Sequence, residues 1–218
     1  MSDGEIVIER GLPEHLREAG VALFDEAFGD KMRMAIRDRD KRLAFMARVY
    51  VADHVVVALR DGELLGMAGL SSGAGHYGGG LMDIPWDPRP FRDLLGLPGS
   101  IMAVLSLRGS EHKPAIDELY IDGVAVAPEA RGLGIGTKLL DEVLVIAREG
   151  RMRWVRLDVI DTNPRAQSLY ERLGYKVTKV QSFRYMRRII GFGGMVSMEL
   201  PVSDGEAGGR AAAGAGGI

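Results

Sequence analysis

The 218-residue chain contains no cysteine. Without thiols it can form no disulfide, offer no thiolate ligand to a metal and build no acyl-enzyme on a cysteine. An excess of charge of one sign is also lacking, because 28 Lys and Arg face 30 Asp and Glu, for a formal net charge of -2. This balance gives no general attraction to nucleic acid or to an anionic membrane surface, and we expect neither as a partner.

Long apolar runs are missing as well. The sequence has no stretch of about 18 apolar residues, so it predicts no membrane-spanning helix. The first ten residues, MSDGEIVIER, are polar and acidic and predict no signal peptide, and we therefore expect a cytoplasmic protein. The four histidines show no ligand-like spacing, so no metal site is expected either.

Apolar periodicity predicts an α/β domain with a mixed sheet. Strands are predicted at residues 5–10 and, as a hairpin around Asp61-Gly62, at 54–59 and 64–70. Helices are predicted from Leu12 to a stop at Gly29, and over residues 31–49. The second half alternates strand and helix, with predicted elements at residues 118–126, 134–148, 154–160, 164–173, 175–180 and 195–200.

Residues 1–202 are predicted to form a single domain that carries an insertion at 71–113. The insertion opens with the loop-like SSGAGHYGGG and continues with four prolines among apolar residues, which predicts an irregular or partly helical segment. Its apolar residues must cover either their own core or a second subunit, and we expect a homodimer. Residues 203–218 are rich in Gly and Ala without apolar periodicity, and they are predicted to be a disordered tail.

A glycine-rich turn lies between the strand that ends at residue 126 and the helix that begins near 134. Glycines allow backbone N–H groups to approach a ligand closely, and a helix N-terminus adds partial positive charge. Together they predict a site for a pyrophosphate. A dinucleotide-dependent oxidoreductase has a similar turn and needs an acidic residue about 20 residues further on. Asp158 leaves that alternative open, although it lies inside a predicted strand.

Two motifs in this region resemble those of the GNAT superfamily of N-acetyltransferases. The pyrophosphate signature Arg/Gln-x-x-Gly-x-Gly/Ala fits Arg131, Gly134 and Gly136. The signature Asn-x-x-Ala-x-x-Leu-Tyr-x-x-x-Gly-Phe/Tyr fits Asn163, Ala166, Leu169, Tyr170, Gly174 and Tyr175. The resemblance covers residues 118–180, whereas 5–70 match only in element order and 71–113 not at all. It implies a mixed, mostly antiparallel central sheet flanked by helices, with a V-shaped splay between strands 118–126 and 154–160.

The resemblance also implies acetyl-CoA as the acyl-donor co-substrate. Its pantetheine arm would pair with the backbone of Val124, Ala125 and Val126, and Asn163 would bond the arm from the following helix. Its pyrophosphate would lie after Arg131, on the backbone amides of Gly132, Leu133, Gly134, Ile135, Gly136 and Thr137. The implied reaction is direct attack of a primary amine, on a small molecule or peptide, within a ternary complex. The alternative is a non-catalytic acyl-CoA-binding or sensing module on the same fold.

Catalytic residues follow from the same comparison. Tyr170 matches the position that protonates the departing thiolate, although a phenol is a weaker acid than a thiol, so it could serve only as a hydrogen-bond donor. Glu118 lies at the spacing before Arg131 where some family members carry a catalytic glutamate, and it is our first candidate for the general base. Asp122 is the second candidate, because strand alternation places it on the side of Glu118. His76, in the glycine-rich loop, and His112, just before this strand, are further candidates, either as the base or as part of the acceptor site.

Overall fold

The computed structural model describes residues 4–33, 36–77, 81–108, 112–183 and 192–202. The tail predicted to be disordered, 203–218, lies outside the described residues. Within the described ranges, no helix is long and apolar enough to cross a membrane.

Seven strands form one sheet in the order β1-β2-β3-β4-β5-β7-β6. Strands β4 and β5 run parallel, and the other neighbouring pairs run antiparallel. The strands are β1 (Val7–Arg10), β2 (Val55–Arg60), β3 (Glu63–Ser72), β4 (Glu118–Val126), β5 (Trp154–Ile160), β6 (Lys176–Ser182) and β7 (Gly194–Pro201). This confirms the predicted mixed, mostly antiparallel sheet and the β2–β3 hairpin.

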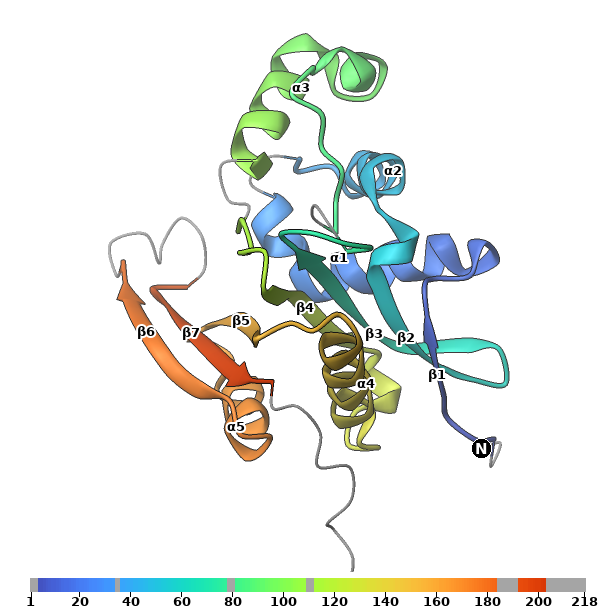
Figure 1. Cartoon of the computed structure of the whole chain (residues 1–218). Coiled ribbons are helices and arrows are strands. Elements are labelled where there is room, and N and C mark those ends of the chain that lie inside the picture. The colour runs from blue at the N-terminus through green and yellow to red at the C-terminus, as the bar shows by residue number, and fades with distance from the viewer. Residues whose placement is uncertain (1–3, 34–35, 78–80, 109–111, 184–191, 203–218) are drawn as a thin grey trace, which may run out of the picture.

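Helices cover both faces of the sheet (Figure 1). One face packs against α4 (Ile135–Glu149) and α5 (Pro164–Arg172), and the other against α1 (Arg17–Arg33), α2 (Arg39–Val49) and part of α3 (Arg92–Arg108). Strand alternation accounts for the two layers, because Val56 and Ala58 of β2 belong to the α4 side whereas Val55 and Val57 belong to the α1 side.

The first two helices differ from the prediction at their junction. Helix α1 does not stop at Gly29 but continues to Arg33, and α2 begins only at Arg39, after Asp38 caps it through the Lys41 amide at 2.9 Å. Gly29 is used for close approach, since a Cβ there would lie 2.6 Å from Oδ1 of Asp25. That buried carboxylate forms an ion pair with Arg42 of α2, which ties the two helices together.

The described part of the predicted insertion is partly helical. Residues 89–91 form a 3-10 turn that runs into α3, and Gly96, with φ 68°, breaks the helix ahead of Pro98. Leu81, Ile84 and Phe91 join the core on the α1 side. Figure 1 shows α3 projecting beyond α2, away from the sheet, while Ala103 and Val104 of this helix also belong to the core on the α1 side.

Candidate functional site

Strands β4 and β5 pair for only part of their length. The parallel register runs from Glu118 opposite Trp154 to Ile121 opposite Leu157. Beyond this point residues 123–126 pair with β3 and residues 158–160 pair with β7. The predicted splay therefore begins after Ile121. The backbone predicted to receive the pantetheine arm, at Val124, Ala125 and Val126, lies on the β4 side of the divergence.

A β-bulge at Asp122 explains why β4 turns away from β5. Gly123 lies opposite Gly69 of β3 and Ile121 lies opposite Leu70, which leaves Asp122 without a partner in the register. A bulge bends its strand and re-aims the side chain of the extra residue. It also shifts the alternation, because Ile121 and Val124 both pack on the α4 side. The strict alternation used in the prediction therefore holds only as far as Ile121.

The glycine turn after β4 presents backbone rather than side chains. Gly132 and Gly134 have φ of 86° and 75°, and a Cβ built on either would meet no protein atom within 4 Å. The amide of Lys138 donates to the carbonyl of Gly134 at 3.1 Å, so the amides of residues 135–137 precede the helical ladder of α4. A turn with open space and unpaired amides at a helix N-terminus suits a pyrophosphate.

The side chains around this turn hold it in place. The Nε of Arg131 donates to the carbonyl of Val126 at 3.2 Å and so joins the turn to the end of β4. Ile135 is buried in the core, whereas Leu133 is exposed. The sequence predicts that these residues lie together, and the structure places them in one turn. Their contact with a ligand stays a prediction.

Helix α5 carries the second set of predicted residues. Asn163 caps the helix, its Oδ1 accepting from the Ala166 amide at 3.2 Å, and its contact with the pantetheine arm stays a prediction. Tyr170 is buried, with its ring centroid 5.7 Å from that of Tyr175. Burial raises the pKa of Tyr170 to about 12, so its hydroxyl keeps its proton throughout the physiological range.

Glu118 lies at the centre of a network of charged side chains. Only 2% of its side chain is exposed, yet both carboxylate oxygens are bonded: Oε1 to Nε2 of His112 at 2.7 Å and Oε2 to Nη1 of Arg156 at 2.9 Å. The Nε of Arg156 also donates to Glu199 of β7 at 3.1 Å. The imidazole of His112 stacks on the ring of Tyr120, with centroids 4.1 Å apart and planes 23° apart.

Arg156 and Glu199 are the site residues that sequence reasoning missed. They lie on β5 and β7 and face each other across the antiparallel register. No local pattern links them to Glu118, which lies 38 residues before Arg156. The available signal was an Arg on the partly exposed face of β5, opposite the buried Val155 and Leu157, and this signal has no specificity on its own.

Tyr120 and Asp122 extend the polar surface toward the splay. The Tyr120 hydroxyl donates to Oδ2 of Asp158 at 3.1 Å, and burial, followed by the charge of Asp158, raises the pKa of this phenol. Ser71 donates to Oδ1 of Asp122 at 3.3 Å. Oδ2 of Asp122 is closed to solvent and has no hydrogen-bond partner among the described residues. Burial raises the pKa of Asp122 to about 6, against the effect of the Ser71 hydrogen bond.

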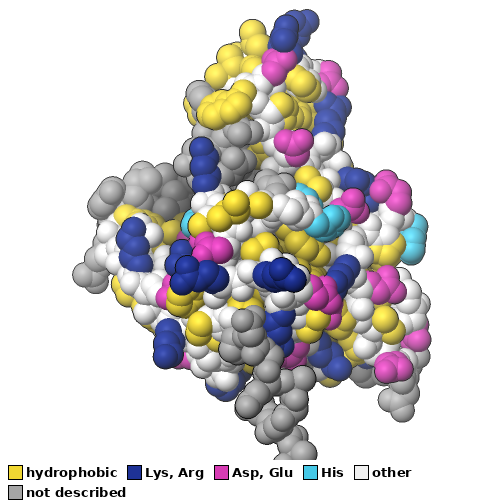
Figure 2. All heavy atoms as spheres, in the orientation of Figure 1, with side chains coloured by type: hydrophobic (Ala, Val, Ile, Leu, Met, Phe, Trp, Pro, Cys, Tyr) yellow, Lys and Arg dark blue, Asp and Glu magenta, His cyan; other side chains and the backbone are white. Residues whose placement is uncertain are grey.

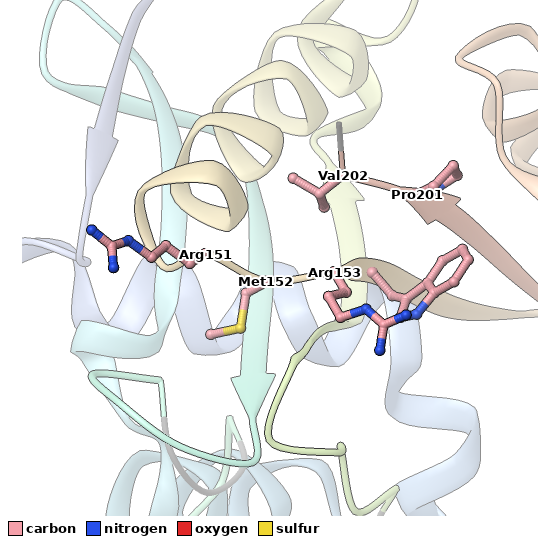
Figure 3. Close-up of a pocket in the computed structure, with 6 residues that line it drawn as sticks. Arg151, Met152, Arg153, Pro201 and Val202 are labelled. Carbon is pink, nitrogen blue, oxygen red and sulfur yellow. The ribbon is translucent and has the colours of Figure 1, made fainter. Parts of the chain in front are cut away.

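A cavity of about 500 Å³ opens at the start of β5. It is lined by Arg151, Met152, Arg153, Trp154, Pro201 and Val202, and Figure 3 shows the side chains of Arg151 and Arg153 pointing in opposite directions. None of the predicted donor-binding residues lines it. It lies at the end of β5 where the strand still pairs with β4, so it is separate from the splay and the glycine turn. Among the described residues, no group of three or more His, Asp or Glu side chains is arranged to hold a metal ion.

Comparison with known proteins agrees with this geometry. Residues 21–175 match the Acetyltransferase (GNAT) family. A thialysine N-epsilon-acetyltransferase of Bos taurus is 41% identical over 56 residues, which are 26% of this chain and 33% of that protein. The chain spans about a third to a half of the length of the curated relatives that it matches.

Solved structures share the fold at low sequence identity. An N-acetyltransferase from Staphylococcus aureus Mu50 superposes with a TM-score of 0.61 at 19% identity, over 89% of this chain and 100% of that chain. The yncA protein of Salmonella typhimurium, solved with its cofactor acetyl-CoA, gives a TM-score of 0.55 at 17% identity, over 94% and 99% of the two chains.

Proposed function

The chain belongs to the acetyltransferase (GNAT) family, and on this premise we propose that it transfers an acetyl group from acetyl-CoA to a primary amine. One observation carries the proposal. The strands β4 and β5 separate after Ile121, and the freed end of β4 leads directly into a glycine turn with open space in front of unpaired helix amides. A thioester arm and a pyrophosphate need such an arrangement.

Donor binding is assigned to the backbone of the two predicted segments. The amides of Gly132, Leu133, Gly134, Ile135, Gly136 and Thr137 would hold the pyrophosphate, with Arg131 fixing the turn to β4. The backbone of Val124, Ala125 and Val126 would pair with the pantetheine arm. Asn163 would contact the arm through its amide nitrogen, while its Oδ1 caps α5.

The reaction is a direct attack. The amine nitrogen bonds to the thioester carbon, the carbon–sulfur bond breaks, and CoA leaves as a thiolate that needs a proton or a hydrogen bond. Tyr170 is the proposed donor. With its pKa at about 12 and that of a thiol near 8.5, full proton transfer would be uphill by about 5 kcal/mol. We therefore assign Tyr170 to hydrogen-bonding the sulfur, with the proton coming finally from solvent.

The acceptor must lose a proton before or during attack, and Glu118 is proposed to take part in this step. Because only 2% of its side chain is exposed and its oxygens already accept from His112 and Arg156, Glu118 is not open to direct contact with the amine in this arrangement. An alkyl amine needs this help most, since it is mostly protonated at neutral pH. One relative is named for acetylating the ε-amine of thialysine, which supports testing primary alkyl amines first.

An acceptor screen tests the function. Purified protein is mixed with acetyl-CoA and one amine at a time: thialysine, lysine, linear diamines, aminoglycosides and a peptide with a free N-terminus. Released CoA is read with a thiol reagent, and the absence of cysteine means that the protein itself adds no signal. We expect amine-dependent CoA release with at least one class. Tight acetyl-CoA binding without release by any amine would indicate the acyl-CoA-binding module instead.

A homodimer is proposed from the surface of α3. Figure 2 shows hydrophobic side chains gathered at the top of the molecule, where α3 lies, and Leu97, Ile101 and Met102 are among the exposed apolar residues. Burying them against a second copy would remove this apolar surface from water. Sedimentation at micromolar concentration tests the pairing, and a monomer at all concentrations would contradict it. The cytoplasmic location stays a prediction.

A further inference from the structure

The network around Glu118 ends in an imidazole that faces solvent. The side chain of His112 is 37% exposed and its Nε2 is held by Glu118, which is itself buried. Stacking on Tyr120 fixes the plane of the ring. A carboxylate that accepts from one ring nitrogen leaves the other nitrogen with the lone pair. The structure thus builds an oriented imidazole whose Nδ1 is the atom able to accept a proton.

We propose that His112, oriented by Glu118, is the general base that removes the proton from the attacking amine. The inference rests on the proposed function and names a residue for its proton transfer. As the nitrogen–carbon bond forms and the carbon–sulfur bond breaks, the amine proton passes to Nδ1 of His112. The imidazolium is stabilised by the Glu118 carboxylate and then releases the proton to solvent. Glu118 is a positioning residue in this scheme, because it touches His112 rather than the amine.

The other acids are less suited to meet an amine. Glu118 has both oxygens bonded and only 2% of its side chain exposed. The free oxygen of Asp122 is closed to solvent, and its other oxygen is bonded to Ser71 on the β3 side. Compared with these two acids, His112 combines a fixed ring orientation with a side chain that is 37% exposed.

The neighbours of His112 are mostly acidic or neutral. Glu118 and Tyr120 of β4 contact it directly, and Asp122 acts on it at longer range. From β5, Arg156 shares the Glu118 carboxylate and Asp158 binds the Tyr120 hydroxyl. The positive charge of Arg156 is matched by both Glu118 and Glu199. An imidazolium formed at His112 would therefore be compensated.

Nitrogen-15 NMR tests the geometry without any activity assay. The chain has four histidines, so a His112→Gln variant assigns the His112 signals by their loss. We expect the neutral ring to carry its proton on Nε2, with Nδ1 unprotonated, and expect Glu118→Gln to mix the two tautomers. A neutral ring protonated on Nδ1 would overturn the proposal, whatever the acceptor is.

Chemical rescue tests the role. His112→Ala is assayed by CoA release with thialysine, or with the fastest amine of the screen if thialysine is inactive. We expect kcat/KM to fall about 100-fold or more, and millimolar imidazole to restore part of it. His15→Ala, a change at an exposed histidine in the 3-10 turn before α1, is the control and should keep full activity without imidazole. Activity of His112→Ala near that of wild type would overturn the proposal. A defect that imidazole does not relieve, together with loss of turnover in Asp122→Asn, would assign the base to Asp122. If wild type itself turns over no amine, the proposed function fails while the tautomer result still stands.

Discussion

The two ends of strand β4 offer a ligand different kinds of chemistry. At its C-terminal end, Val126 leads into a turn where the available groups are backbone amides, and the glycines carry positive φ and open space. At its N-terminal end, Glu118 is surrounded by side chains from three other segments, at His112, Arg156 and Glu199. The bulge at Asp122 separates the two.

The difference predicts two patterns of sensitivity to mutation. A backbone site tolerates changes of side chain but not a residue that forbids its φ or fills its space. A side-chain network tolerates changes of shape poorly and changes of charge still less, because each buried charge is balanced by its partner. Substitutions of the turn glycines should therefore lower the affinity for the donor, whereas removing a charge around Glu118 should lower turnover with donor affinity nearly unchanged.

Gly134→Val should have the largest effect. Its φ of 75° disfavours a β-branched residue, and the new side chain would enter the space in front of the helix amides. Losing two charge-assisted hydrogen bonds of about 1.5–3 kcal/mol each would lower acetyl-CoA affinity about 100-fold or more. Isothermal titration calorimetry measures it directly.

Gly62→Val is the matched control for that experiment. Gly62 of the β2–β3 turn has φ 80° and equally open surroundings, so the backbone strain is alike. We expect both variants to lose similar stability in thermal melts, while only Gly134→Val loses acetyl-CoA binding. Equal affinity in the two would show that the turn after β4 is a structural connection only.

The backbone end could be predicted from sequence because its requirements are local. Positive φ and close approach demand glycine at fixed spacing, so Gly132 and Gly134 leave a pattern within a few residues. The same holds for strands 118–126 and 154–160, which the structure reproduces with the predicted bounds. Helix α1 continues past Gly29, because this glycine makes room for the side chain of Asp25 and does not end the helix. That contact cannot be read from the sequence.

The side-chain end could not be predicted to the same degree. Glu118 was found through the resemblance, but its partners come from a loop and two strands that meet only in the folded sheet. The bulge at Asp122 likewise depends on its register with β3, and the adjacent Gly123 is only a weak local signal for it. The partners of Glu118 and the bulge at Asp122 both depend on which strands pair and in which register. A single sequence does not show this pairing directly.

Glu118→Gln sharpens the comparison at the side-chain end. The amide keeps the shape but gives up the charge that orients His112, so kcat/KM should fall about 100-fold while acetyl-CoA affinity stays within about twofold. Glu199→Gln is the matched control, since Glu199 bonds the same Arg156 but no described contact joins it to His112. The control should lose less than tenfold in kcat/KM. Equal losses of kcat/KM in both variants would show that the loss comes from disturbing Arg156 and not from disturbing the orientation of His112.

Asp122 lies at the bulge between the two ends of β4, and Asp122→Asn should change the free energy of unfolding in a pH-dependent way. The pKa of Asp122 is raised from 3.8 to about 6, so the folded protein holds this proton more tightly than the unfolded chain does. Ionisation then destabilises the fold, with no cost below about pH 4 and the full cost above about pH 6. The variant should gain about 2 kcal/mol at pH 7–8, allowing for partial exposure, and nothing below pH 4. Urea unfolding across pH measures this, with Asp141→Asn on the exposed face of α4 as a control that should stay within about 0.5 kcal/mol.

Tyr170→Phe should have the smallest effect on activity. It removes the proposed hydrogen bond to the sulfur that leaves with CoA. A lost hydrogen bond to a thiolate is worth about 1.4 kcal/mol, or about tenfold in kcat, with acetyl-CoA affinity nearly unchanged. Because burial raises the pKa of Tyr170 to about 12, the phenol stays protonated from pH 6 to 10. The ratio of wild-type to variant kcat should therefore be constant over that range, unlike a defect in amine deprotonation, which shrinks as the free amine forms. Tyr175→Phe, at the neighbouring buried ring, is the control and should keep kcat. A Tyr170→Phe defect that disappears at high pH would place Tyr170 on the amine side of the reaction and remove it from the sulfur.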